Sequence, residues 1–444
     1  MSVFVSWKGM ENIPVIAKCD CLVVGGGPGG FSAAVAASEH GAEVILVERY
    51  GTPGGMAFHG EVSPFMPNHV NMGTEEAPNW ISLDKPIFTR WRNKMWEYGN
   101  GERKENNPFN PEEVRTRINR NAAMLAIEDL LLEAGVKLLY HHTFVGVIME
   151  GRKIAYAVFH SKSGFCAIAA ESFVDGTGDA DVAFQAGCRT LFGNEEGYCQ
   201  PMTLCFKLGK VDWERKPETA KINEIYNEVK GRGELPGCHR HNVLYFTTED
   251  PDVIHFNTTR VIMKSGVNGL ELSEAEVEGR RQMRLYLKFL RKYIPGFEKA
   301  EILSIGSHIG VRETRRVLGR TYQEVSDFEE ARTYPDGIAR IRYMVDIHNP
   351  KGSGTETRHL PGDKWYEIRF SSIVPADCDN LVVGCRAISV DHALHSSSRI
   401  MPPVCSVGQA AGLACALAKK MGIDVCNVDG VLLRQKLVEY GANL

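Results

Sequence analysis

The chain has 444 residues, a length that exceeds one ordinary hydrophobic core, so two domains are expected. The 43% of residues that are hydrophobic can fill both cores. Its 51 Lys and Arg residues are balanced by 55 Asp and Glu residues. This balance excludes the broad basic surface with which proteins bind nucleic acid or anionic lipid, and it favours a small-molecule partner.

The organising stretch is residues 19–49, where an apolar run at 22–24 precedes three glycines, Gly25, Gly27 and Gly30. This order predicts a strand, a tight turn and a helix. The first glycine permits the turn, the second lets a pyrophosphate approach the backbone, and the third lets the helix pack on the strand. A second strand, residues 43–47, leads to Glu48, where an acid binds a ribose diol. The pattern predicts a dinucleotide site.

Four further motifs follow in chain order: GTPGGMA at 51–57, DGTGDAD at 175–181, GVRETRRVLG at 310–319, and SSSRIMPPVCSVGQAAG at 396–412. With these motifs the chain resembles the FAD-dependent oxidoreductases of the glutathione reductase superfamily, and most closely a broad bacterial family of that description. The resemblance covers almost the whole chain. It implies FAD as the cofactor, and it does not specify a substrate.

The motifs and the resemblance together assign the predicted cofactor contacts to Gly25, Gly27, Gly30, Glu48, Arg49, Gly54, Gly55, Met56, Val145, Gly178, Asp179, Arg386, Gln409 and Ala410. Within this set the resemblance gives Val145 a backbone contact to the adenine and places Asp179 near the pyrophosphate. Where relatives have Gly-Arg after the last strand, this chain has Cys385 before Arg386, which puts the close transfer of that contact in doubt.

The predicted fold class is α/β: a Rossmann-like FAD-binding domain, with a parallel sheet and a three-stranded meander, plus a discontinuous α+β substrate domain. The FAD-binding domain is expected to comprise residues 1–60, 111–184 and 371–444. Residues 61–110 are expected to form a loop-rich excursion near the active site, and residues 185–370 the substrate or cap domain.

Within these segments, 61–110 is too irregular in period for a core element, so a loop beside the cofactor is predicted, with a surface loop lacking ligand contacts as the alternative. A long helix is predicted from about Glu112 to Ala134, ended by Gly135. The next stretch turns at Gly151 and Gly164 and predicts strands that rejoin the nucleotide sheet.

The cap domain is predicted to contain a sheet that shields the flavin, with helices on one side. Its clearest helix is expected to open at a capping box formed by Ser273 and Glu276 and to end before Pro295. In the 310–319 motif, a buried ion pair among the close charges is one explanation. The other is that Arg312 holds an anionic substrate. A metal site at His308, His348 and residues 238–241 lacks ligand spacing, so no metal is expected.

The tail carries the richest chemistry. A helix predicted from about Gly408 is expected, by the resemblance, to point its N-terminus at the flavin and to stabilise reduced flavin. The candidate catalytic residues are His395, His392, Arg399, His59 and Arg312. His395 is the leading acid/base, because an imidazole exchanges protons near neutral pH.

The other histidines have open alternatives. His392 could pair with Asp391 or orient its neighbour, and His59 could contact the flavin or even tether it covalently. A structural role is an equal alternative for each histidine.

The expected reaction is hydride transfer between flavin N5 and a small polar alcohol, amine, or activated alkene or carbonyl, with Arg399 or Arg312 anchoring the substrate. The alternatives are a flavin-dependent monooxygenase or halogenase and, against the charge balance, a nucleic-acid-modification flavoprotein. Only one dinucleotide fingerprint is present, so an external electron acceptor or donor is expected.

The N-terminal 20 residues lack a signal-peptide core, and no apolar run approaches bilayer length. A cytoplasmic protein without membrane insertion is therefore expected. The 12 cysteines form no CxxC pair, which fits reduced core residues and counts against a disulfide relay. The oligomeric state is open, and a homo-oligomer is among the options.

Overall fold

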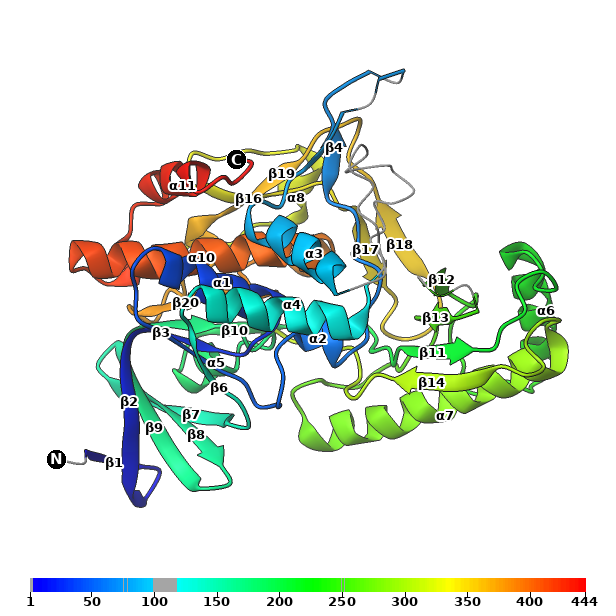
Figure 1. The fold of residues 1–444 in the computed structure, drawn as a ribbon, viewed down its shortest axis with the longest axis horizontal. Coiled ribbons are helices and arrows are strands. Elements are labelled where there is room, and N and C mark those ends of the chain that lie inside the picture. The colour runs from blue at the N-terminus through cyan, green and yellow to red at the C-terminus, as the bar shows by residue number, and fades with distance from the viewer. Residues whose placement is uncertain (1–2, 75, 78, 99–117, 249, 251) are drawn as a thin grey trace.

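The computed structural model describes residues 3–74, 76–77, 79–98, 118–248, 250 and 252–444 (Figure 1). Its largest sheet has eight strands, with the order β6-β3-β2-β9-β8-β7 and with β1 and β20 added beside β2 and β9. The strands are β1 (Phe4–Trp7), β2 (Met10–Val24), β3 (Val44–Val47), β6 (Lys137–Leu139), β7 (Thr143–Glu150), β8 (Lys153–Ser161), β9 (Gly164–Asp175) and β20 (Leu381–Val383). The expected mixed α/β sheet is confirmed.

Strand β9 joins two parts of this sheet. Its first half pairs antiparallel with β8, which pairs with β7, and its second half pairs parallel with β20, while β2 runs parallel beside both halves. The predicted turns at Gly151 and Gly164 are confirmed by their positive φ angles of 61° and 95°. The meander therefore rejoins the parallel strands, as predicted, just before Gly176.

Helices α1 (Pro28–Glu39) and α10 (Met401–Met421) pack against each other beside the parallel strands (Figure 1). They approach so closely that a Cβ on Gly408 would lie 2.0 Å from the Gly29 carbonyl oxygen, and one on Gly412 would lie 2.0 Å from the Ala33 oxygen. These pairs show that the two helices run parallel. Helix α10 extends about 9 Å beyond the N-terminus of α1, at 1.5 Å per residue.

The start of α10 corrects two predictions. The helix begins at Met401 rather than near Gly408, because Pro402 and Pro403 fit a helical first turn, which lacks intrahelical N–H partners. The helix is also long and apolar enough, by length and composition alone, to cross a membrane, which the sequence prediction overlooked. Within the protein, 94% of that apolar window is buried, as expected for a core helix.

Two other predicted helices begin at different residues. Helix α4 is observed as Arg120–Glu133, capped by Asn119, and the predicted start at Glu112 lies outside the described residues. Helix α7 spans Gly269–Tyr293, with Asn268 accepting hydrogen bonds from the amides of residues 270 and 271. The predicted Ser273 capping box is wrong, because Asn268, five residues earlier, already caps the helix.

The excursion after residue 60 contains regular structure that sequence periodicity missed. Strands β4 (His69–Asn71) and β5 (Trp80–Ser82) form a hairpin, and α3 (Ile87–Glu97) follows it. Helix α3 buries Ile87, Trp91 and Met95 in the main hydrophobic core, so the prediction that no core element lies here is wrong. The residues repeat at helical spacing, but interleaved arginines obscure the pattern.

A second antiparallel sheet has the order β12-β13-β11-β14, formed by β11 (Phe206–Gly209), β12 (Tyr245–Thr247), β13 (Ile254–Phe256) and β14 (Glu301–Ile305). Its apolar face, with Phe206 and Phe256 stacked at 5.0 Å, packs against α6 (Thr219–Gly231) and α7 in a separate core (Figure 1). This sheet has helices on one side, and its role as a cap that shields the flavin stays a prediction.

The remaining elements are short: α2 (Gly55–Phe58), α5 (Asp181–Gln185), β10 (Thr190–Phe192), β15 (Arg315–Val317), α8 (Val325–Glu329), β16 (Gly337–Ile341), β17 (Val345–His348), β18 (Thr355–Arg358), β19 (Tyr366–Arg369), α9 (His392–Ser398) and α11 (Gly430–Glu439). Apolar residues of β16 and β19 share the first core with α10 and α11, although the prediction assigned them to the cap. The domain boundaries stay a prediction.

Candidate functional site

Three glycine-containing loops meet at the carboxyl ends of the parallel strands. The amide of Gly54 donates to the Gly26 carbonyl at 2.8 Å, and that of Gly176 donates to the Val24 carbonyl at 2.9 Å. Gly25 has a φ of +98°, and a Cβ there would lie 2.6 Å from the Gly176 oxygen. Above Gly27, by contrast, the nearest atom to an added Cβ is 3.9 Å away. This open backbone beside the N-terminus of α1 fits a pyrophosphate.

The third glycine of the fingerprint has the predicted packing role. A Cβ on Gly30 would lie 1.9 Å from the Gly25 carbonyl oxygen, so only glycine lets α1 lie this close to β2. Gly54 caps α2 in the left-handed region with a φ of 118°, and Gly55 follows it with a φ of 47°. Met56 lies in the same short helix and is partly exposed.

Glu48 lies at the end of β3, as predicted, and is buried. One carboxylate oxygen accepts a hydrogen bond from the Gly26 amide at 2.8 Å, and the other accepts one from the Tyr50 amide at 3.0 Å. Burial raises the pKa of this carboxyl, against the lowering effect of the two amides. The carboxylate thus ties β3 to the glycine turn. The adjacent Arg49 is exposed and lies over the Tyr50 ring at 4.7 Å.

Asp179 and Arg386, predicted separately, form an ion pair with 2.6 Å between Oδ1 and Nη2. Thr314 also donates to Asp179 at 2.7 Å, and a Cβ on Gly178 would lie 2.7 Å from the Arg386 Nη1. The Nε of Arg386 has no hydrogen-bond partner among the described residues, so this guanidinium keeps a free donor beside the glycine loops. The preceding Cys385 is buried.

The remaining predicted cofactor contacts separate into two groups. Val145 lies where the register of β7 against β8 shifts, between Phe144 and Gly146, so its backbone is locally released from the regular ladder. Gln409 and Ala410 instead lie two turns inside α10 and are buried, with Gln409 donating to the Lys85 carbonyl at 2.7 Å. Their predicted place at a helix N-terminus is wrong. Met401 occupies that place.

His59 is held on both ring nitrogens. Its Nε2 lies 3.2 Å from the Thr52 oxygen, its Nδ1 lies 3.3 Å from the Ser307 hydroxyl, and its ring lies 4.0 Å from that of Tyr50. Burial lowers the pKa of His59 to about 4. These contacts describe a residue that joins the second glycine loop to residues 306–308, and neither nitrogen is left for a flavin tether.

His395 lies in α9, directly before α10, and only 1% of its surface is exposed. Its Nδ1 has no hydrogen-bond partner within the described part of the chain. Burial lowers the pKa of His395 well below its usual value, and the charges of Arg316 and Arg399 lower it further. His395 is therefore neutral at pH 7, with a free ring nitrogen at the start of α10.

His392, Glu313 and Arg316, which lie near His395 in the fold, contact one another in ion pairs. His392 contacts Glu313, with 2.8 Å between Nδ1 and Oε1, rather than Asp391, which caps α9. Glu313 also forms a buried ion pair with Arg316. The first explanation offered for the 310–319 motif is thus confirmed for these two residues.

Arg312 is not part of that pair. Its Nη1 donates to the Pro201 carbonyl and to the Thr203 hydroxyl, both at 2.6 Å. Arg399 lies near it, with Nη2 3.4 Å from the Gln200 oxygen and 3.7 Å from Asp346. The sequence prediction missed the polar residues around these two arginines, namely Gln200, Arg240, Arg260 and Asp346. They come from four distant segments and show no spacing signal.

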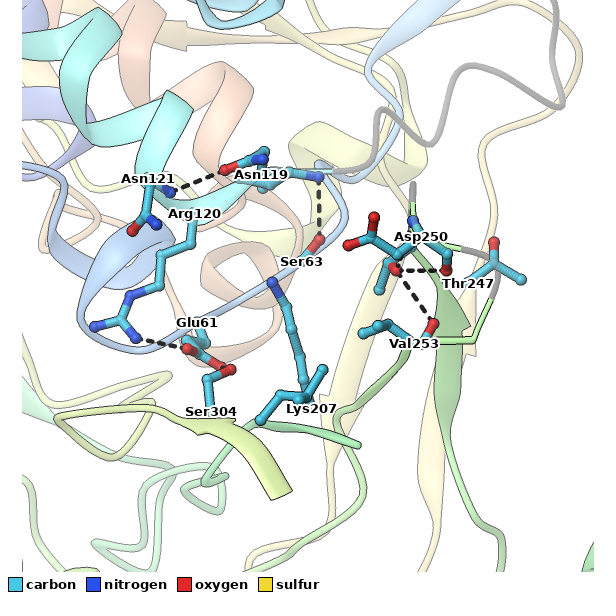
Figure 2. Close-up of a pocket in the computed structure, with 13 residues that line it drawn as sticks. Glu61, Ser63, Asn119, Arg120, Asn121, Lys207, Thr247, Asp250, Val253 and Ser304 are labelled. Carbon is cyan, nitrogen blue, oxygen red and sulfur yellow. Dashed lines mark hydrogen bonds and ion pairs between the residues drawn. The ribbon is translucent and has the colours of Figure 1, made fainter. Parts of the chain in front are cut away.

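A polar cavity of about 260 Å³ lies where the excursion meets the second sheet (Figure 2). Figure 2 shows Lys207 extending from β11 into this space, and Arg120 reaching Glu61. Glu61 accepts hydrogen bonds from Arg120 at 2.6 Å and from Ser304 at 2.9 Å. The cavity is thus lined by residues of both parts of the protein.

The face of the second sheet opposite α6 and α7 carries Lys207 and His255 beside Phe246. Cys205 and Lys207 alternate with Phe206 and Leu208, which face the apolar core, so they share the other face. His255 of β13 is paired with Lys207 and is buried, with neither ring nitrogen bonded to a described residue. Burial lowers its pKa to about 3.

His308 and His348, the histidines weighed as metal ligands from the sequence, contact other groups. His308 Nδ1 lies 2.6 Å from the Ile309 oxygen, and His348 Nδ1 lies 3.0 Å from Arg260. Among the residues that the structure describes, no group of three His, Cys, Asp or Glu side chains is placed to hold a metal ion. All 12 cysteines are buried and free, as expected for reduced core residues.

Three solved structures illustrate what this chain is similar to. A geranylgeranyl bacteriochlorophyll reductase-like protein from Thermoplasma acidophilum is 13% identical, with a TM-score of 0.46 over 95% of this chain and 83% of that one. A myxobacterial chondrochloren halogenase is 12% identical, with a TM-score of 0.42 over 96% and 79%. The anhydrotetracycline hydroxylase OxyS from Streptomyces rimosus is 11% identical, with a TM-score of 0.41 over 96% and 66%.

Sequence comparison with protein families gives the stronger result. No curated protein is similar enough to this chain to count as a match. The model of the family described as FAD dependent oxidoreductase matches residues 20–437, nearly the full length. The chain belongs to the FAD-dependent oxidoreductase family, and it is a flavoenzyme with FAD as its cofactor.

Proposed function

We propose that this enzyme oxidises a small polar metabolite by hydride transfer to FAD, with His395 as the base that takes the substrate proton. The observation that carries the proposal is the buried, neutral His395, whose free Nδ1 lies at the start of α10 beside Arg399. When bound, FAD would supply a hydride acceptor at its N5 atom. The residues of the chain position the substrate and manage charge and protons.

The residues proposed to hold FAD are those at the carboxyl edge of the parallel sheet. Gly25, Gly27, Gly30, Gly54 and Gly55 shape the backbone for the pyrophosphate, and Glu48 faces the same turn, where it would bind the ribose diol. Arg386, Gly178 and Asp179 lie together in the adjoining loop, and the released backbone of Val145 would contact the adenine. Arg49 and Met56 flank this site.

Helix α10 contributes through its N-terminus. The helix extends past the N-terminus of α1, so its positive dipole end would face the region beyond the dinucleotide phosphates. Pro402 and Pro403 have no N–H, and the amide of Val404 donates to the Ile400 carbonyl at 3.2 Å, so the dipole rather than a row of free amides acts there. Negative charge that develops there during reduction is stabilised by about 1 kcal/mol or more where water is excluded. The N-terminus of α10 would in this way make bound FAD a better hydride acceptor.

His395 is neutral at pH 7, which is the form that accepts a proton from a substrate hydroxyl or amine. The imidazolium that forms in this step is disfavoured electrostatically by Arg316 and Arg399. An anion bound beside Arg399 would therefore assist the proton transfer. Arg312 and Arg399 are proposed to anchor the substrate, and His392, bound to Glu313, to position the segment.

A flavin-dependent monooxygenase or halogenase is the second candidate. Solved structures similar to this chain include a halogenase and a hydroxylase, which belong to the class that the sequence analysis kept as the alternative. Their TM-scores are below 0.5, so the choice rests on the residues of this chain. The free Nδ1 of His395 favours proton removal, and with it the oxidase or dehydrogenase reaction.

The remaining assignments are part of the same proposal. The electron acceptor is an external molecule such as dioxygen, a quinone or a carrier protein, the compartment is cytoplasmic, and neither nucleic acid nor a membrane is a partner. The oligomeric state is open, and a homo-oligomer is among the options.

An anaerobic screen tests the proposal. The purified holoenzyme is mixed with a library of alcohols, amines and hydroxy acids without a nicotinamide, and absorbance in the flavin band is recorded. Bleaching by one chemical class supports substrate oxidation. Bleaching only by NADH or NADPH, followed by oxygen-dependent modification of an aromatic compound, would establish the second candidate instead.

A further inference from the structure

We propose that four arginines, the buried Arg240 and Arg260 and the partly exposed Arg312 and Arg399, form one binding site for a small organic substrate that carries two anionic groups. This inference rests on the proposed function, because the same site presents that substrate to the FAD. It adds a substrate class and two residues of the cap, Arg240 and Arg260, to the predicted anchors.

Side-chain contacts link Arg260 to Arg399. Arg260 Nη2 lies 3.0 Å from His348 Nδ1, and His348 Nε2 lies 3.4 Å from Asp346. Arg399 Nη2 lies 3.7 Å from the same Asp346 oxygen. Arg312 donates to Pro201 and Thr203, in the same segment as Gln200, which Arg399 contacts. Burial lowers the pKa of both Arg312 and Arg260, and Arg240 is close enough to lower it further electrostatically. Four side chains from separate segments thus converge on one region.

The charges in this region are unbalanced. Within the part of the chain that the structure describes, the four guanidinium groups make one ion pair, between Arg399 and Asp346. His348 adds no charge at pH 7, because burial and the neighbouring arginines lower its pKa to about 3. An excess of three positive charges is therefore held in a region that is largely withdrawn from solvent, which is unfavourable unless anions accompany them. A single carboxylate would leave most of that excess, and two anionic groups compensate it better.

The arginines repel one another, and in addition to burial this repulsion lowers the pKa of Arg312 and of Arg260. Burial lowers the pKa of Arg312 to about 9, with further lowering by Arg399, Arg240 and Arg260. Burial also lowers the pKa of Arg260 to about 10, again with a contribution from Arg240. Groups whose charges are this unfavourable in the free protein gain the most from an anion.

Donors also remain free for a ligand. Arg240 is 5% exposed, and its Nη1 has no hydrogen-bond partner among the described residues. Gln200 is 1% exposed, and its side-chain Nε2 likewise has no hydrogen-bond partner in the described ranges. The Gln200 oxygen contacts Arg399, so its free amide belongs to the cluster. Buried donors are normally satisfied, so these two indicate a missing acceptor.

The cofactor does not explain the cluster. The side-chain hydrogen bonds of the four arginines go to residues 200–203, 242, 257 and 346–355. Among the described residues, none of these arginine hydrogen bonds reaches the nucleotide loops at 25–30, 48–56 or 175–179. The cluster and the glycine loops are therefore separate anion sites.

Guanidinium groups match carboxylates and phosphates in the same bidentate way, so the probes must separate these two sources. The holoenzyme is titrated at constant ionic strength with succinate, citrate and glycerol 3-phosphate, and with acetate and neutral succinamide as controls. Two readouts are followed, the Tm and the visible flavin spectrum, because neither needs turnover.

The expected result is that the dianions raise Tm and shift the flavin spectrum, whereas succinamide does neither. The relative effects of succinate and glycerol 3-phosphate then assign carboxylate or phosphate. Arg240→Gln should weaken dianion binding about 10-fold or more at unchanged FAD content. Arg240→Lys should weaken it less, and Arg284→Gln, which removes an exposed arginine of α7, should leave it unchanged.

Equal stabilisation by succinamide and succinate, or parental dianion affinity in Arg240→Gln, would overturn the anion site. These outcomes differ from failure of the proposed function. If dianions bind through Arg240 but no anionic or neutral metabolite reduces the flavin anaerobically, the hydride-transfer reaction is wrong while the anion site stands.

Discussion

At the scale of single residues, the properties of His395 follow from its surroundings. It is a buried imidazole of α9, and three arginines lower its pKa in addition to burial. This neutral but weak base becomes stronger when an anionic substrate offsets the charge of Arg399, the one of these three arginines that belongs to the proposed anion site. Substrate binding and proton removal are thereby coupled at one ring nitrogen.

Replacing His395 by Ala should slow anaerobic flavin reduction about 100-fold or more, because general base catalysis contributes that much. Flavin content should change little, since no described nucleotide loop contacts this ring. Stopped-flow absorbance measures the rate. The exposed His359→Ala provides the matched control and should keep the parental rate. Equal rates in the His395 and His359 variants would remove His395 from the mechanism.

Replacing Glu48 by Ala should weaken FAD binding about 10-fold or more, because a charge-assisted contact to the ribose and the anchor of the glycine turn are lost together. Titration of apoprotein with FAD, followed by flavin fluorescence, gives the Kd. Glu43→Ala removes an exposed acid just before the same strand and should have no effect. An unchanged Kd for the Glu48 variant contradicts the ribose role.

At the scale of secondary-structure elements, the contact between α1 and α10 fixes the site. Glycines on both helices let the backbones touch, and this contact carries the N-terminus of α10 past the glycine turn. Any added side chain must separate the two helices. The cofactor site and the substrate site would then move relative to each other.

Gly412→Ala tests this contact. The added Cβ would lie 2.0 Å from the Ala33 oxygen, and overpacking of this kind costs about 1–3 kcal/mol. We expect a lower Tm and a lower flavin content in the purified protein. Gly231→Ala, at the end of α6, places its Cβ in open space and should be neutral or slightly stabilising. Parental Tm in Gly412→Ala would show that the helices are not this close.

The link between the excursion and α10 predicts a pH effect. Asp84 accepts hydrogen bonds from Asn68 and Ser406, both at 2.9 Å, and burial raises its pKa from 3.8 to about 7. The folded state therefore binds this proton more tightly than the unfolded state. Its contribution to stability is present below about pH 4 and is lost as pH rises toward 7, by about 1.4 kcal/mol per pH unit.

Asp84→Asn should remove that dependence. Urea unfolding at pH 5 and pH 7 measures it: the free energy of unfolding of the parent should fall relative to that of the variant between these two values. A parallel change in parent and variant would mean that Asp84 is already ionised in the folded protein.

At the scale of the whole molecule, local chemistry made part of the structure predictable. The glycine turn, Glu48 and the meander follow from residues that are close in sequence, and the structure confirms their local geometry. Helix α3 was missed because arginines interrupt its apolar stripe. The start of α10 was misplaced because its prolines were taken as loop residues.

The arginine cluster could not be predicted from the sequence. Arg240 lies in a loop after α6, Arg260 follows β13, and Arg399 ends α9, so only tertiary packing brings them to Asp346. No fixed spacing connects them. The cluster also lies where the second sheet meets the segment after β17, and such contacts between distant segments leave no periodic signal.

The central claim is tested most directly by anaerobic stopped-flow measurement of flavin absorbance. The oxidised holoenzyme is mixed with a small dianionic hydroxy acid or amino acid series in one experiment, and with NADPH in another. Our account predicts bleaching by a dianionic substrate without NADPH, and loss of that bleaching in His395→Ala. Flavin that stays oxidised with every substrate but bleaches with NADPH would contradict the account and indicate a monooxygenase-type enzyme.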